Sequence, residues 1–351
     1  MSRFMSERFS GLVAYVPGEQ PRDMSYIKLN TNESPYPPAP AVFEAINAEE
    51  IAKLRLYSDP ECRELKKTLA AYLDVGTENI FPGNGSDEIL SFAFMAFCDE
   101  NVAVSYPDIS YGFYPVFAQL YGIEKNEIPL REDFSIEPED YYGLGNTIFI
   151  ANPNAPTGLC LSADSIEKIL KANPDNLIVI DEAYVDFGAE SCVPLTKKYD
   201  NLLVIQTFSK SRSYAGGRLG FAVAAEPIIS DLESLRYSTN PFNVDRLSLV
   251  AGIAAIESQD YYDKNNEGII QNREYARVEL QNLGFEVLES RANFLFVSPP
   301  KLSAAELYSG LRQRGILVRY FDKPRIDSFV RITIGTRNEM EALLAAVREM
   351  L

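Results

Sequence analysis

The sequence lacks two residue types that many enzymes use. None of its 351 residues is histidine or tryptophan. Without histidine, the chain cannot build a Ser-His-Asp triad, a Cys-His dyad or a histidine-ligated metal site from its own residues. A general base must therefore be a lysine, an aspartate, a glutamate, a tyrosine or a cysteine.

Cysteine is scarce, and positive charge is outnumbered. The four cysteines are Cys62, Cys98, Cys160 and Cys192. They lie far apart without a Cys-x-x-Cys pair, so we expect reduced thiols in a cytoplasmic protein, with neither a metal site nor a disulfide scaffold. The 33 basic and 50 acidic residues give a net charge of −17, and no basic run is present. This balance argues against nucleic acid as a partner, but a few arginines focused in a cleft could still bind an anionic small molecule.

Long apolar runs are also missing. The most apolar stretch, residues 89–98, is too short to span a membrane. The first ten residues are charged and lack the apolar segment of a signal peptide. We therefore expect neither a secretory leader nor a membrane association.

Short apolar runs alternate with helical patterns in most of the chain. Strands are predicted at residues 102–105, 147–151, 177–180, 202–207 and 220–224. This alternation predicts an α/β fold with a mainly parallel sheet flanked by helices. A long helix at about 260–283 is then followed by strands at 285–288, 294–298 and 330–334 and by helices at 304–314 and 338–350. We therefore expect a large domain over 31–240, a smaller α+β domain over 241–351, and an N-terminal arm over 1–30 that packs with the small domain or a partner subunit.

Two polar residues follow buried strand patterns. Asp181 ends the run Leu-Ile-Val-Ile-Asp, and Lys210 ends Ile-Gln-Thr-Phe-Ser-Lys. In an open parallel sheet, ligands bind outside the carboxyl ends of the strands, so both side chains are predicted at the same edge. Each also has an ordinary interpretation when taken alone, as a helix-capping aspartate and as a solvent-exposed lysine.

Two turn motifs stand before or after such runs. The glycine-rich turn of residues 81–88 (Phe-Pro-Gly-Asn-Gly-Ser-Asp-Glu) precedes an apolar helical pattern. Such a turn presents free N–H groups to an anion, although this one lacks the lysine of a P-loop. Residues 151–158 (Ala-Asn-Pro-Asn-Ala-Pro-Thr-Gly) follow a strand and indicate a turn. Within it, the side chain of Asn154 could donate to a ligand oxygen.

The order of these motifs is more specific than any one of them. Along the chain come the glycine-rich turn, Tyr111, the Asn-Pro turn, Asp181-x-x-Tyr184, Ser209-Lys210 and Arg218. This order resembles the fold-type I pyridoxal-phosphate-dependent aminotransferases of the class II subfamily over nearly the whole chain. Within them, residues 15–18 (Tyr-Val-Pro-Gly), 28–36 (Lys-Leu-Asn-Thr-Asn-Glu-Ser-Pro-Tyr) and 329–336 are similar to the histidinol-phosphate aminotransferases.

The resemblance implies a seven-stranded sheet in the large domain and pyridoxal 5′-phosphate as the cofactor. Lys210 would carry the cofactor covalently, and Asp181 would keep its ring nitrogen protonated so that the ring can act as an electron sink. The other cofactor contacts that the resemblance implies are Ser86, Asp87, Ser209 and Arg218 at the phosphate, Tyr111 on the ring face, and Tyr184 and Asn154 at the ring oxygen. The chain departs from the family pattern at Ala155, where asparagine usually precedes Pro-Thr-Gly.

The resemblance also implies a shared active site and a substrate pocket. Tyr57 matches a tyrosine that crosses to the cofactor phosphate of the other subunit, which implies a homodimer. Arg319 and Arg331 match arginines that bind substrate, and a guanidinium can hold a carboxylate or a phosphate as a bidentate fork. Tyr15 and Asn32 would help to close the site.

The implied reaction is a ping-pong transamination in histidine biosynthesis. L-histidinol phosphate and 2-oxoglutarate would give imidazole-acetol phosphate and L-glutamate. An aromatic-amino-acid aminotransferase and a threonine-phosphate decarboxylase on the same fold stay open as alternatives, although the His-Gly-Gly element of the decarboxylases is missing. A non-catalytic cofactor-sensing regulator is more distant, because the chain has no spare length for a DNA-binding domain.

Overall fold

The computed structural model describes residues 2–9 and 11–351, and its centre is a sheet of seven strands. The strands are β2 (Ile80–Gly83), β3 (Val104–Pro107), β4 (Lys125–Ile128), β5 (Thr147–Ala151), β6 (Ile178–Asp181), β7 (Leu202–Thr207) and β8 (Gly220–Ala224). Their order across the sheet is β2-β8-β7-β6-β5-β3-β4. Only β8 runs against its neighbours, β7 and β2, so the prediction of an α/β fold with a mainly parallel sheet is confirmed.

Helices cover both faces of this sheet, which explains why its inner strands are continuous apolar runs. They are α1 (Pro40–Ala45), α3 (Arg63–Leu73), α4 (Gly85–Phe97), α5 (Tyr114–Tyr121), α6 (Ala163–Ala172), α7 (Glu226–Thr239) and α8 (Arg246–Glu257), while the short α2 (Ala48–Ala52) lies against α8 and buries no residue. Successive residues of β6 point to opposite faces: Ile178 and Ile180 pack with α3, α6 and α8, while Val179 packs with α4, α5 and α7. Burial on both faces fixes the register, because a slip by one residue would exchange the two sets.

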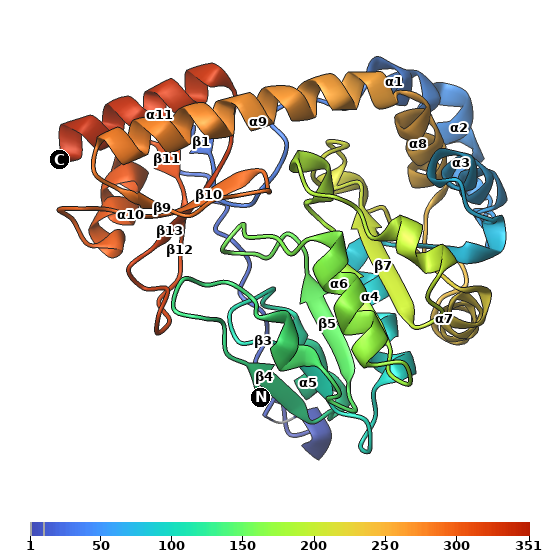
Figure 1. Ribbon diagram of the computed structural model, residues 1–351. Coiled ribbons are helices and arrows are strands. Elements are labelled where there is room, and N and C mark those ends of the chain that lie inside the picture. Colours follow the sequence, from blue (N-terminus) through green and yellow to red (C-terminus); the bar gives the residue numbers. More distant parts are fainter. Residues whose placement is uncertain (1, 10) are drawn as a thin grey trace.

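A second group of elements lies beside the large sheet (Figure 1). It consists of β9 (Glu286–Val287), β10 (Phe294–Ser298), β12 (Arg319–Tyr320), β13 (Val330–Thr333), α9 (Gln259–Asn282), α10 (Ala304–Gln313) and α11 (Arg337–Met350). The four strands form an antiparallel sheet in the order β12-β13-β10-β9. The long helix α9 runs from the region of α1 and α8 to α11 (Figure 1) and so ties the two groups together.

The N-terminal segment touches both groups. Its strand β1 (Ile27–Lys28) pairs in parallel with β11 (Ile316–Leu317) of the second group. Before it, Gln119 of α5 donates to the carbonyl oxygen of Gly11 and accepts from the N–H of Val13. The domain limits stay a prediction. Helix α8 packs with α1 and α3, and α9 is the first helix to reach the second group.

Two strands of the large sheet were not predicted. Strand β2 contains Pro82 and Gly83, which weaken a strand pattern, yet it forms because it lies at the edge and pairs only with β8. Strand β4 lies at the other edge, and its first three residues are exposed. None of the described helices is long and apolar enough to cross a membrane.

Candidate active site

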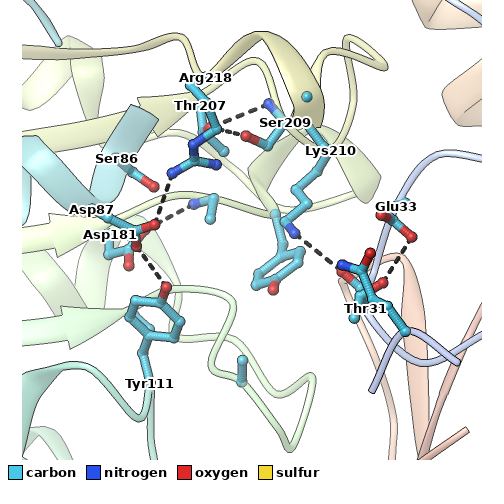
Figure 2. A pocket seen from close by; sticks show the side chains of 17 residues that line it. Thr31, Glu33, Ser86, Asp87, Tyr111, Asp181, Thr207, Ser209, Lys210 and Arg218 are labelled. Carbon is cyan, nitrogen blue, oxygen red and sulfur yellow. Dashed lines mark hydrogen bonds and ion pairs between the residues drawn. The ribbon is translucent and has the colours of Figure 1, made fainter. Parts of the chain in front are cut away.

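A cavity of about 450 Å³ opens at the carboxyl edge of the parallel strands. The last residues of β5, β6 and β7, which are Ala151, Asp181 and Thr207, line it together with the start of α4 and residues 31 and 33. Figure 2 shows Arg218, Asp87 and Tyr111 at one end, and Lys210 and Thr31 at the other. The cavity is large enough for a small-molecule ligand. Among the described residues, no group of histidine, cysteine, aspartate or glutamate side chains could hold a metal ion.

Lys210 points its amine into this cavity. Its Nζ donates to the carbonyl oxygen of Thr31 at 3.3 Å and lies 5.9 Å from the centre of the Tyr184 ring. Burial, and then the positive charge of Arg331, lower the pKa of Lys210 to about 8. A larger share of neutral amine is therefore present near neutral pH than on an exposed lysine, and a neutral amine is a nucleophile and a base.

Asp181 stands at the base of the cavity as the last residue of β6. One carboxylate oxygen accepts from the N–H of Ala183 at 3.2 Å, and the other accepts from the hydroxyl of Tyr114 at 3.3 Å. Burial raises the pKa of Asp181 to about 6. The group is thus mostly ionised at neutral pH and basic enough to hold a proton on a partner nitrogen.

Two glycines shape an anion cradle at the start of α4. Gly85 opens the helix with a φ of +76°, and a Cβ there would lie 2.7 Å from Nη2 of Arg218. A Cβ at Gly220 would lie 2.8 Å from the backbone nitrogen of Ser86. Only glycine at both positions lets β8 and Arg218 close over the free N–H groups of the helix start, where an anion is favoured. Ser209, which follows β7, lines the same cavity.

Asp87 links Arg218 to Tyr111. Its carboxylate forms an ion pair with Arg218 at 2.9 Å and accepts from the hydroxyl of Tyr111 at 2.6 Å. Both partners are therefore held in place at the cradle end, and the Tyr111 ring lines the cavity wall.

Tyr184 and Asn32 meet between the two groups of elements. The amide nitrogen of Asn32 donates to the Tyr184 hydroxyl at 2.9 Å, and the hydroxyl of Thr333 donates to the amide oxygen of Asn32 at 3.0 Å. All three residues are buried. Burial raises the pKa of Tyr184, while Arg331 and the Asn32 hydrogen bond lower it in part.

Arg331 and Arg319 lie side by side on β13 and β12. The Arg331 guanidinium packs near the rings of Phe294 and Phe321, at 5.3 and 5.6 Å, and donates to the carbonyl oxygen of Asn30 at 3.1 Å. Its buried Nε has no partner. Burial lowers the pKa of Arg331.

The partners of these two arginines are backbone oxygens. Arg319 donates to the carbonyl oxygens of Val16 and Pro17, next to Tyr15. The ring of Tyr15 stacks on Phe113 at 4.3 Å. Within residues 2–9 and 11–351, no carboxylate forms an ion pair with either arginine, so their charge is available to an anionic ligand.

Two predicted cofactor residues are not brought to this cavity by their own chain. The amide of Asn154 donates to the carbonyl oxygen of Ile109, in the loop after β3, at 2.9 Å and to the hydroxyl of Thr157 at 3.2 Å, so it ties two loops together, and Ala155 lines the cavity instead. Tyr57 is 79% exposed and stacks on Phe242 at 4.4 Å. Their cofactor contacts stay predictions.

Sequence reasoning missed several residues that line the cavity. Thr207 is the last residue of β7, which is a signal that strand ends could have given. Thr31 and Glu33 flank Asn32 in a motif from which only the asparagine was chosen. Gln20 comes from the proline-rich N-terminal segment, where no pattern points to a ligand.

Comparison with known proteins identifies the class of protein to which this chain belongs. The family model described as aminotransferase class I and II matches residues 25–347, so the chain is a pyridoxal-phosphate-dependent aminotransferase. Histidinol-phosphate aminotransferases from Brachyspira hyodysenteriae and Clostridium acetobutylicum are 49% and 47% identical to it. Each match covers 100% of this chain, and 99% and 100% of those proteins. The chain belongs to the histidinol-phosphate aminotransferase family.

A solved structure supports the same assignment. The histidinol-phosphate aminotransferase of Sinorhizobium meliloti, in complex with pyridoxal-5′-phosphate, matches with a TM-score of 0.85 and 25% identity. The match covers 93% of this chain and 92% of that one. The residues present here fit that cofactor, since the cavity offers an amine in Lys210, a buried carboxylate in Asp181, and a glycine-lined cradle under Arg218.

Proposed function

We propose that the protein transfers the amino group of L-histidinol phosphate to 2-oxoglutarate, giving imidazole-acetol phosphate and L-glutamate. The observation that carries this proposal is the pair Arg319 and Arg331, which has no carboxylate partner among the described residues. Arg331 lies close enough to Lys210 for its positive charge to lower the pKa of that amine, and Arg319 is its neighbour on the next strand. Such a pair can take a phosphate ester in one half-reaction and a dicarboxylate in the other. The names of the full-length relatives support the same substrate.

The cavity residues divide the chemical work. When bound, pyridoxal phosphate supplies an aldehyde that takes up the amino group and a ring that withdraws electrons. Lys210 would hold the cofactor through its amine and, when that amine is not bonded to the cofactor, would serve as the base for the proton at the substrate carbon. Asp181 holds the proton of the ring nitrogen, and Tyr184 donates to the ring oxygen.

The remaining residues position the two ligands. At the cofactor phosphate, the proposal places the backbone N–H groups of Ser86 and Asp87, the hydroxyl of Ser209 and the guanidinium of Arg218. Tyr111 covers the ring face. Arg331 and Arg319 bind the substrate anion, and Tyr15 closes the entrance beside them.

We further propose that two copies of the chain share their active sites. Tyr57 is exposed and does not line the cavity of its own chain, and the nearby side chains of Ile51, Leu54, Leu56 and Phe242 are exposed as well. An apolar surface of this kind is suited to a second subunit. Tyr57 would then reach the cofactor phosphate of the partner.

A hybrid dimer tests this sharing. Lys210→Ala and Tyr57→Ala homodimers should both be impaired. If Tyr57 serves the other subunit, mixing the two variants creates one site with both Lys210 and Tyr57 intact, and activity recovers. No recovery in a verified hybrid would mean that Tyr57 acts within its own chain or not at all.

A cytoplasmic location is part of the proposal. Cys62, Cys98, Cys160 and Cys192 are all free thiols, as is usual in a reducing compartment. Small molecules are the expected partners. Fractionation of cells that produce the protein would test the location, and recovery in a membrane or secreted fraction would contradict it.

The visible absorption spectrum of the purified protein tests the substrate. The band of the lysine-bound cofactor should disappear on addition of L-histidinol phosphate and return with 2-oxoglutarate. Loss of the band with an aromatic amino acid alone would favour the aromatic aminotransferase, and release of carbon dioxide from threonine phosphate would favour the decarboxylase. Lys210→Ala should retain cofactor without a covalent link and lose turnover.

A further inference from the structure

We propose that Asn32 and Thr333 are positioning residues that fix the direction of the Tyr184 hydroxyl proton, so that it points into the cavity. The inference rests on the proposed function, because it assigns this proton to the cofactor's ring oxygen. It replaces a direct substrate contact of Asn32 with an action through Tyr184. The contacts among these three buried residues carry it.

The orientation of the Asn32 amide follows from its two neighbours. The hydroxyl of Thr333 accepts from the backbone N–H of Asn32 at 2.9 Å, so its own proton goes to the amide oxygen of Asn32 at 3.0 Å. The amide nitrogen must then face Tyr184 and donates to its hydroxyl at 2.9 Å. If the amide were turned the other way, the hydroxyl proton of Thr333 would no longer have the amide oxygen of Asn32 as its acceptor.

The direction of the Tyr184 proton follows from that of the amide. A hydroxyl has one proton, and a hydroxyl oxygen that accepts from Asn32 must send this proton elsewhere. The described residues offer it no acceptor, and the side chain lines the cavity. The proton is therefore directed at a ligand. Asn32 itself is held in a left-handed conformation, with φ of 55°, and its carbonyl oxygen accepts from Asn293 at 3.0 Å.

The departure at residue 155 makes this arrangement more important. Ala155 lines the cavity but offers no side-chain donor, and the amide of Asn154 already donates to Ile109 and Thr157. Tyr184 is thus left as the ring-oxygen donor from this side. A single donor contributes fully only when its proton cannot turn away, which is what Asn32 and Thr333 ensure.

The hydrogen bonds from Thr333 through Asn32 to Tyr184 also connect two parts of the molecule. Asn32 precedes the large sheet, Tyr184 follows β6, and Thr333 ends β13 in the second group. If the second group moved away, Thr333 would leave Asn32, and the amide would be free to turn. The strength of the ring-oxygen donor therefore depends on how closely the second group packs against the first.

The test is a pH titration of the cofactor's visible absorption without substrate. In Asn32→Asp, a carboxylate accepts the Tyr184 proton, so the ring oxygen loses its donor and becomes more basic. The titration midpoint should rise by about one pH unit, the size expected for one hydrogen bond to an anion, and kcat/KM should fall about tenfold. Thr333→Val should shift the midpoint in the same direction by less, and Thr333→Ser should restore it.

A buried asparagine far from the cavity is the matched control. Asn173 donates to the carbonyl oxygens of Tyr141 and Ile169, so Asn173→Asp disturbs the fold without touching the site and should leave the midpoint unchanged. Unshifted midpoints in both Asn32→Asp and Thr333→Val would overturn the inference. A higher substrate KM with no spectral shift would also overturn it, since Asn32 would then contact the substrate directly. A wild-type protein that shows no cofactor band would refute the proposed function instead.

Discussion

Arg331 is expected to weaken the cofactor-free protein while it serves the substrate. Its guanidinium lies between two aromatic rings, has one backbone acceptor in Asn30, and leaves a buried Nε without a partner. Its neighbour across the sheet is another cation, Arg319. A charge in this setting is unfavourable until an anion arrives.

Replacement of Arg331 by methionine separates the two effects. The variant loses one hydrogen bond from a charged group, about 1.5–3 kcal/mol, but it also removes an unsatisfied buried group that costs about 1–3 kcal/mol. Because the two contributions nearly cancel, the free energy of unfolding of the cofactor-free variant should stay within about 1 kcal/mol of the wild-type value. Substrate binding should suffer, because truncation of one partner of a buried charge pair costs about 2–5 kcal/mol. This corresponds to a loss of about 30-fold or more in kcat/KM.

The assays are urea unfolding of the cofactor-free protein and single-turnover kinetics with histidinol phosphate and with glutamate. Arg273 gives the matched control, because this buried arginine is satisfied by the carbonyl oxygens of Phe187 and Ala292. Arg273→Met should lose about 2–4 kcal/mol of stability and keep its substrate KM. The reasoning is refuted if Arg331→Met is destabilised like Arg273→Met and still turns over both substrates normally.

Three further predictions concern packing, protonation and cofactor capture. Gly220→Ala places a Cβ 2.8 Å from the backbone nitrogen of Ser86, which cannot give way. The free energy of unfolding should therefore fall by about 2–4 kcal/mol, and the affinity for the cofactor should fall with it. Gly143→Ala is the control, because its Cβ meets open space and should cost only about 1 kcal/mol. Burial raises the pKa of Glu182 to about 7, so this residue holds a proton in the folded protein over the range in which it is ionised in the unfolded chain. Its contribution to stability is present at low pH and is lost as pH rises, by up to about 3 kcal/mol between pH 4.5 and 7. Urea unfolding over this range should show that loss in the wild type and not in Glu182→Gln, and equal slopes would contradict it. Burial lowers the pKa of Lys210 to about 8. When pyridoxal phosphate is added to the cofactor-free protein, the rate at which the visible band returns should therefore rise with pH, with a midpoint near pH 8. A midpoint of this rate profile above pH 10 would contradict burial of the amine as the cause.

The fold was predictable where a strand is buried on both faces. Strands β5, β7, β8 and β10 have the predicted bounds, because each is a mainly apolar run of the length typical of a strand. The edge strands β2 and β4 escaped prediction, since one carries Pro82 and Gly83 and the other carries exposed polar residues. Strand β2 is buried along its whole length, but a proline and a glycine within four residues hide its strand pattern, whereas β4 exposes its first three residues.

The site was predictable where chemistry coincides with a strand end. Asp181 ends β6 and Lys210 comes shortly after β7, and the topology of a parallel sheet brings such residues to one edge. The contact between Asn32 and Thr333 joins residues 301 positions apart, and no local pattern announces it. The same holds for Gly85 beneath Arg218, where the reason for the glycine appears only once β8 and α4 are packed together.

The three arginines of the site solve two different electrostatic problems in an acidic chain. Arg218 already has a counter-ion in Asp87, so a phosphate placed there must share it, and the free N–H groups at the start of α4 supply the rest of the attraction. Arg319 and Arg331 are held by carbonyl oxygens, which orient a guanidinium but do not neutralise it. The first arrangement suits a ligand that stays, because Lys210 is proposed to hold it covalently as well. The second arrangement suits ligands that come and go. An unneutralised pair of positive charges attracts either substrate anion, and when that anion leaves, no other anionic partner competes for the two arginines.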